Sequence, residues 1–109
     1  MNNITLDIAK VFSRYPAGRL QVDGPFSGER FRNEVIAPAL RRFEKVTILL
    51  DGAAGYGSSF LEEAFGGLIR DGFELAFLQA RLDFVSEDES LPLEIWSYME
   101  DEDSRKAAR

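Results

Sequence analysis

The chain has 109 residues, close to the commonest size of one domain, and apolar residues, including nine Phe, make up 45% of it. It contains neither cysteine nor histidine, which excludes disulfide bonds, thiolate nucleophiles, cysteine-based metal sites and histidine general bases. The net charge of −6 argues against general nucleic-acid binding, because phosphates attract basic proteins. We expect a single domain over residues 1–109, with an acidic tail that frays from about residue 100.

Charge is distributed unevenly along the chain. Residues 1–45 carry eight Lys and Arg against five Asp and Glu, a net charge of +3, whereas residues 46–109 have a net charge of −9. No apolar run is long enough for a membrane span and no signal-peptide pattern is visible, so we expect a cytoplasmic protein without membrane or nucleic-acid partners. Arginine outnumbers lysine ten to three, which is compatible with a GC-rich bacterial genome. Four arginines are expected on the solvated face of one helix: Arg30, Arg32, Arg41 and Arg42.

The first part of the chain predicts two strands and then a helix. Apolar residues alternate in ITLDIAKVF (4–12), which indicates a strand. After the turn RYPAG, the segment RLQV (19–22) is read as a short strand that forms a hairpin with the first. Apolar residues then recur at every fourth position and predict an amphipathic helix from about Ser27 to Phe43. Pro38 inside this helix predicts a kink or an early end.

The middle of the chain predicts a central strand and a second helix. KVTILL (45–50) is short and nearly all apolar, as expected of a strand covered on both faces. A helix is predicted over residues 58–70, and Ser59 with Glu62 has the S-x-x-E spacing of a capping box. The glycines at 66–67 cost about 1 kcal/mol each inside a helix, which indicates close packing on a neighbouring backbone or a helix that loosens.

The last part of the chain predicts further strands and a final helix. ELAFLQA (74–80) is read as a strand, LDFV (82–85) as another short strand, and a helix is predicted from Ser90 to about Lys106. This order of elements predicts an α/β sandwich with a mixed central sheet of four to five strands and about three helices.

The segment DGAAGYGSSFLEEAFGG (51–67) joins the central strand to the second helix and admits several kinds of site. Gly52 and Gly57 have the G-x-x-x-x-G spacing of a phosphate-binding loop, but Ser58 occupies the position of its lysine. Amides at the helix N-terminus could still hold an anion, which would suit a small-molecule or nucleotide sensor. A serine nucleophile would need a general base, and the G-x-S-x-G elbow is missing.

Two serines and two glutamates open the second helix. Ser58 and Ser59 either act only as caps or accept a phosphate, which the helix dipole would favour and the glutamates would repel. Glu62 and Glu63 are adjacent and point about 100° apart on a helix, so they are poorly placed to share a catalytic or metal-binding task. We expect Glu62 to cap the helix and Glu63 to be solvated, and we expect no enzyme, cofactor or metal ion.

Two stretches, TILLD (47–51) and SSFLEEAFGGL (58–68), resemble the STAS-like family of unassigned function, which is related to the STAS domains of anti-sigma-factor antagonists. GPFSGERFRNEV (24–35) is similar to one subgroup of that family, and the likeness extends over roughly residues 4 to 99. In regulatory STAS domains, a partner kinase phosphorylates the first serine of a D-S-S/T-G motif before the second helix. The partner is a histidine-kinase-like ATPase that also acts as the anti-sigma factor.

The resemblance implies a STAS-like fold and a non-enzymatic regulatory module that binds a protein partner. Matching the helix starts makes Ser58 and Ser59 phosphorylation candidates, whereas Gly57 and Phe60 differ from the acidic residue and the glycine of the motif. The implied partner is a histidine-kinase-like ATPase, and the chain is expected as a monomer or weak homodimer. Tyr56 is either an aromatic anchor for the partner or folds back on its own core. The expected partner-binding residues are Gly55, Tyr56, Gly57, Ser58, Phe60 and Glu63.

Overall fold

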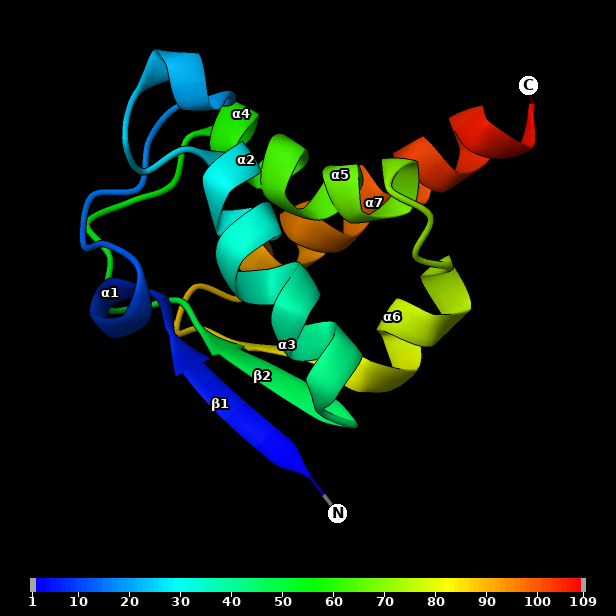
Figure 1. The fold of residues 1–109 in the computed structure, drawn as a ribbon, viewed down its shortest axis with the longest axis horizontal. Coiled ribbons are helices and arrows are strands. Elements are labelled where there is room, and N and C mark those ends of the chain that lie inside the picture. The colour runs from blue at the N-terminus through cyan, green and yellow to red at the C-terminus, as the bar shows by residue number, and fades with distance from the viewer. Residues whose placement is uncertain (1, 109) are drawn as a thin grey trace.

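A computed structural model of the chain describes residues 2–108. Three strands form one parallel sheet in the order β1-β2-β3, with β1 at Asn3–Asp7, β2 at Lys45–Leu49 and β3 at Leu82–Val85 (Figure 1). The expected mixed sheet of four to five strands is therefore wrong in strand number and direction, although the α/β class is confirmed. Since all three strands run the same way, the segments that follow them emerge at one end of the sheet.

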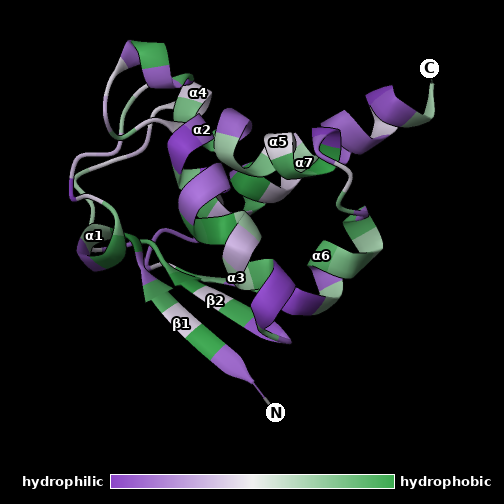
Figure 2. Ribbon diagram, in the orientation of Figure 1, coloured by the Kyte–Doolittle hydropathy of each residue, from purple (hydrophilic) through white to green (hydrophobic). Residues whose placement is uncertain are grey.

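Only one face of the sheet is covered by helices. Val46, Ile48 and Leu82 point inward and are buried, and Figure 2 shows the resulting alternation of apolar and polar residues along β1 and β2. On the outer face, Thr5 lies opposite Thr47, which lies opposite an exposed Asp83. β2 was expected to be covered on both faces, as is usual in parallel sheets. That expectation is wrong, because the helices gather on one side (Figure 1).

The first predicted helix is confirmed and contains a π-helical turn. It comprises α2 (Gly28–Phe31), the π turn Arg32–Ile36 and α3 (Ala37–Arg42). The Ser27 hydroxyl caps its start by accepting from the Arg30 N–H at 3.1 Å. In the π turn, the Ala37 N–H donates to the Arg32 carbonyl oxygen five residues back. Pro38 lies just after this turn, so the helix accommodates the proline with a local widening and continues to Arg42.

The second predicted helix has the same composite construction. It comprises α4 (Ser58–Leu61), the π turn Glu62–Gly66 and α5 (Gly67–Arg70), and it packs closely against the first. At Gly28 an added β-carbon would lie 3.1 Å from the backbone nitrogen of Ala64, so the two backbones approach each other there. The predicted Ser59–Glu62 capping box is wrong. Gly57 is the N-cap and no side chain caps the helix, because arginines bind Glu62 instead.

Three shorter expectations are also corrected. Strand β1 ends at Asp7, whose carboxylate accepts from the Ala9 N–H and starts helix α1 (Ile8–Val11). Residues 19–22 form no strand; a single 3₁₀ turn spans Gln21–Asp23. The reading of segment 74–80 as a strand is wrong, because it lies almost wholly in helix α6 (Leu75–Arg81).

The final predicted helix is confirmed within one residue of its expected end. Helix α7 spans Ser90–Ala107 and includes the acidic segment from residue 100, which was expected to fray. Glu102 is buried, and the Lys106 ammonium donates to the Ile69 carbonyl oxygen at 2.8 Å, so this segment packs against α5. No helix within residues 2–108 is both long enough and apolar enough to cross a lipid bilayer.

Candidate functional site

The segments that follow the three strands meet at the carboxyl end of the sheet (Figure 1). The Asp51 carboxylate, just after β2, accepts from the Ser86 hydroxyl and from the Glu87 N–H, each at 2.8 Å. The Ala54 N–H donates to the Arg14 carbonyl oxygen at 2.8 Å. We call the surface formed in this way the loop end; it comprises residues 11–23, 51–59 and 86–89. Open α/β sheets bind their ligands at this end of the strands.

Tyr56 folds back on its own core. Its hydroxyl donates to the Leu50 carbonyl oxygen at 2.6 Å, and its ring packs against Phe60 with centroids 6.1 Å apart. Burial raises the pKa of the Tyr56 hydroxyl above its ordinary value, and the negative charges of Asp51 and Asp7 raise the pKa further. Tyr56 therefore shapes the loop from beneath, and its hydroxyl is engaged with the backbone of its own chain.

Ser58 and Ser59 lie on the surface of the loop end. Both are exposed, and neither hydroxyl makes a hydrogen bond within the part of the chain that the structure describes. Gly55 and Gly57, two other residues expected to contact a partner, are exposed as well. The loop thus exposes two hydroxyl groups and two glycines to solvent at the start of the composite helix at residues 58–70.

Two residues expected at the partner surface, Phe60 and Glu63, are instead buried, with exposed fractions of 1% and 9%. The Phe60 ring packs 6.0 Å from the Phe31 ring, centroid to centroid. Glu63 accepts from the Arg32 guanidinium at 2.8 Å. The expectation of a solvated Glu63 is wrong because its carboxylate faces the neighbouring helix, where it has a buried cation. The expectation that Arg32 lies on a solvated face is also wrong, because its guanidinium is buried against the Glu63 carboxylate.

The loop end also exposes large apolar side chains that the sequence did not single out. Four of the six exposed large apolar residues among those described lie within residues 11–22. Tyr15 and Val22 are the most accessible of them, at 69% and 87% exposed. The backbone of this segment is fixed, since the Ala17 N–H donates to Phe26 and the Gly28 N–H donates to Gly18. The four exposed large apolar residues of this segment are Val11, Tyr15, Leu20 and Val22.

An arginine–glutamate cluster ties the loop end to the helices. Glu62 and Glu63 share two partners, because Arg19 and Arg70 each contact both carboxylates. Arg70 also binds Glu102 of α7 at 2.8 Å. The two adjacent glutamates thus bind the same two arginines, although they point in different directions, because a guanidinium group is large enough to reach both carboxylates. Sequence reasoning missed these arginines; the one signal for Arg32 was the glycine pair at 66–67, which leaves room for a large neighbouring side chain.

These ion pairs determine the charge state of the site. Burial alone would raise the pKa of Glu62, but hydrogen bonds from Arg70 and Arg19 outweigh it and hold the pKa below its ordinary value. The hydrogen bond to Glu62 likewise raises the pKa of Arg19 and that of Arg70. The arginines therefore keep Glu62 ionised and occupy its oxygens. Within residues 2–108, no group of three or more acidic side chains has an arrangement that could hold a metal ion.

Comparison with known proteins identifies the family of the chain. Residues 27–91 match the family model described as a STAS-like domain of unknown function (DUF4325). The matched part runs from the cap of α2 through the sheet to the start of α7, and it includes Ser58 and Ser59. No curated protein and no solved structure matches the chain. Since the match covers more than half of its residues, the chain belongs to the family of STAS-like domains of unknown function.

Proposed function

We propose that this STAS-like domain is a cytoplasmic regulatory module that binds a protein partner through its loop end and carries out no chemistry of its own. The observation that carries the proposal is the gathering of exposed Val11, Tyr15, Leu20 and Val22 on one short segment. Large apolar side chains are exposed to solvent at a cost, and their concentration on one segment favours an interaction surface there. The Ala54–Arg14 bond and the Arg19–Glu62 ion pair hold this segment against the loop and helix that carry Ser58 and Ser59.

Phosphorylation of Ser58 or Ser59 would weaken this interaction. Glu62 lies four and three residues beyond them on the same helical face. A phosphate there would repel Glu62 and compete with it for Arg19, which anchors the segment that displays Leu20 and Val22. The switch would therefore act by adding charge and by releasing part of the contact surface. By resemblance to regulatory STAS domains, the partner and kinase would be a histidine-kinase-like ATPase.

The proposal is tested by affinity capture from the native host, followed by mass spectrometry of the bound proteins. Val22→Ser and Ser58→Glu should each reduce the recovery of a captured partner about tenfold or more. Ala76→Ser is the control, because Ala76 is also an exposed apolar residue but lies on α6, away from the loop end. The intact mass of the protein isolated from that host should include a species carrying one phosphate, which Ser58→Ala or Ser59→Ala removes.

Two results would contradict the proposal. Equal recovery of the same partner by Val22→Ser and Ala76→Ser would show that the loop end is not the contact surface. A rise in melting temperature of several degrees with a nucleotide, abolished by Ser58→Glu, would instead indicate the sensor with an anion at the start of α4.

A further inference from the structure

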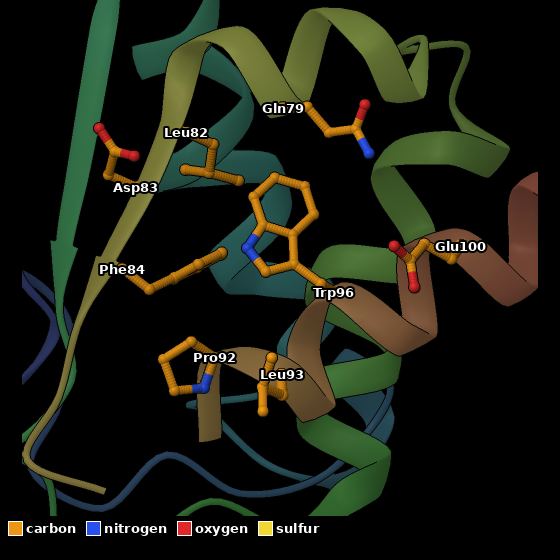
Figure 3. A pocket seen from close by; sticks show the side chains of 8 residues that line it. All are labelled: Gln79, Leu82, Asp83, Phe84, Pro92, Leu93, Trp96 and Glu100. Atoms are coloured by element: carbon orange, nitrogen blue, oxygen red, sulfur yellow. The ribbon is translucent and has the colours of Figure 1, made fainter. Parts of the chain in front are cut away.

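A groove of about 490 Å³ lies between strand β3 and helix α7, apart from the loop end. Its volume falls in the range of sites that hold an organic ligand or the side chains of a peptide. Figure 3 shows Leu82 and Phe84 directed from β3 toward Trp96, whereas Asp83 points to the other side of the strand. The lining residues come from β3, α6 and α7: Gln79, Leu82, Asp83, Phe84, Pro92, Leu93, Trp96 and Glu100.

One wall of the groove is the free edge of the sheet. Within residues 2–108, β3 pairs with β2 alone, and the Val85 carbonyl oxygen accepts from the Leu50 N–H at 3.0 Å, so the peptide groups of Val85 face β2. Alternate residues of a strand direct their backbone groups to opposite sides. The N–H and C=O of Phe84 therefore face away from the sheet, together with the C=O of Leu82. The Leu82 N–H is already bonded, to the Leu78 carbonyl oxygen.

Polar side chains of the groove also lack partners. The Gln79 amide, the Trp96 indole N–H and the Glu100 carboxylate make no hydrogen bond or ion pair within residues 2–108. Figure 3 shows Gln79 above the Trp96 ring and Glu100 beside it, both on the side away from Phe84. An aromatic face beside a carboxylate favours a cation, because the ring attracts positive charge and the carboxylate neutralises it. The eight lining residues include two acids and no Lys or Arg.

We propose that this groove binds an extended basic segment of a protein partner, which adds to the sheet as a fourth strand beside β3. Main-chain hydrogen bonds to Phe84 and Leu82 would hold the segment, as in other cases of strand addition. Side chains of an added strand alternate between the two faces of the sheet. A Lys or Arg on the inner face would extend over the Trp96 ring and pair with Glu100. A cation on the outer face would lie beside Asp83.

This inference is independent of the proposed function, since the groove and the loop end share no residue. Phe84 contacts Trp96 edge to face with centroids 5.7 Å apart, so the floor of the groove is preformed and a peptide need not reorganise the core. Trp96 is the one tryptophan of the chain, and its fluorescence therefore reports on this groove alone.

The test is a fluorescence titration with the peptide acetyl-Thr-Lys-Val-Lys-Thr-Lys-Val-amide, whose lysines lie on one face of a strand. We expect a saturable change in Trp96 emission that weakens as salt is added. The same peptide with Glu in place of each Lys should not bind, and spermidine, which has the charge without the backbone, should bind at least about tenfold more weakly. A peptide with N-methyl groups on the alternate residues whose N–H groups face β3, which removes its donors to this strand, should also lose at least about tenfold in affinity.

Substitution in the protein supplies the matched comparison. Glu100→Gln should weaken the lysine peptide about fivefold to tenfold, whereas Asp101→Asn, an equal change of charge one residue along α7, should change its affinity less than about twofold. Asp101 is exposed and does not line the groove. The proposal is overturned if the lysine peptide gives no saturable change at about 1 mM, or if spermidine or the N-methylated peptide binds as well as it does. Equal effects of the two substitutions would also overturn it.

Discussion

Gly67 lacks a side chain because the Arg32 guanidinium occupies the space beside its α-carbon. A β-carbon at this position would contact Arg32 Nη1 and would lie 2.7 Å from Arg32 Cζ. The guanidinium cannot move away cheaply, since it binds the Glu63 carbonyl and carboxylate oxygens and Asp71. The buried Arg32–Glu63 ion pair thus explains why Gly67 stands inside a helix. The ion pair offsets the cost of about 1 kcal/mol that glycine has there relative to alanine.

Gly67→Ala should therefore destabilise the protein despite the better helix propensity of alanine. We expect a loss of about 2 to 4 kcal/mol in the free energy of unfolding, because the methyl group would break the bonds of a buried cation. Urea denaturation at neutral pH measures the change. Gly55→Ala is the control: an added β-carbon there meets no atom within 4 Å, so its effect should stay within about 0.5 kcal/mol. Equal effects of the two substitutions would contradict the steric explanation.

The Tyr56 hydroxyl supports the loop from inside, which predicts a distinct dependence on pH. Its folded-state pKa is raised above the unfolded value of about 10, so its contribution is fully present below pH 10 and is lost as the pH rises. Tyr56→Phe should cost about 1 kcal/mol at neutral pH through the lost bond to Leu50. The variant should also lose less stability than the unsubstituted protein between about pH 9 and 11.

The measurement is urea denaturation of Tyr56→Phe at neutral and alkaline pH. Tyr15→Phe is the matched control, because Tyr15 is 69% exposed and its hydroxyl makes no hydrogen bond within residues 2–108. The role of the Tyr56 hydroxyl would have to be abandoned if the two variants had the same stability at both pH values.

Among the elements, ion pairs that involve Glu62 join the composite helix at residues 58–70 to the loop end and to α7. Arg70 reaches from α5 to Glu62 and to Glu102 of α7, while Arg19 reaches from the loop end to Glu62. Each arginine therefore fixes a different element against the same carboxylate. Because the Glu62 pKa is lowered, the stabilisation is present above the ordinary glutamate pKa of about 4.3 and is lost as the pH falls below it.

Glu62→Gln should flatten this acid dependence. At neutral pH the variant should be less stable, and the difference should shrink as the pH falls through the lowered pKa of Glu62, because Glu62 of the unsubstituted protein then becomes protonated too. Denaturation midpoints measured from about pH 3 to 7 give the comparison. Glu44→Gln controls for the loss of one negative charge, since Glu44 is exposed and its side chain makes no bond within residues 2–108. A parallel shift of the Glu62→Gln profile at every pH would disprove the linkage.

The sequence predicted the helices with clear periodicity and the strands at 45–50 and 82–85, but it misread two other short segments. Apolar residues at every fourth position and the Ser27 cap located the helix that ends at Arg42. Residues 74–80 alternate enough to suggest a strand, yet they are rich in Ala and Leu and lack β-branched residues, so helix propensity was the better guide. The strand predicted at residues 19–22 was wrong for another reason. The Asp23 and Glu29 carboxylates bind their backbone N–H groups, which no local pattern revealed.

The candidate site was predictable only in part for a similar reason. A helix start after a glycine-rich turn placed Ser58 and Ser59 at the surface, because the polar residues of a turn and cap are local features. The burial of Glu63 depends on Arg32, which is 31 residues away in the sequence, and no periodicity of either segment indicates that pairing. Long-range ion pairs of this kind become visible only once the two composite helices are packed against each other.

The sheet of the whole molecule is unusual because, among the described residues 2–108, no helix covers its outer face and no strand pairs with the outer edge of β3. Parallel sheets usually have both faces covered, whereas here Thr5, Thr47 and the exposed Asp83 form a polar row across all three strands. An uncovered edge strand is a template for pairing with other chains, and natural proteins limit this with short strands and charges. β3 has four residues, and Asp83 is its one charged side chain.

Asp83→Val should therefore promote self-association, because the edge strand would read Leu-Val-Phe-Val and lose its charge. We expect the mean molecular mass from light scattering to rise with protein concentration more steeply than for the unsubstituted chain, while circular dichroism of dilute samples stays the same. Asp101→Val makes the same change of charge and hydropathy on the exposed side of α7, so it distinguishes pairing at the β3 edge from non-specific hydrophobic association. If both variants associate equally, or if neither does, the charge on β3 is not what keeps this edge unpaired.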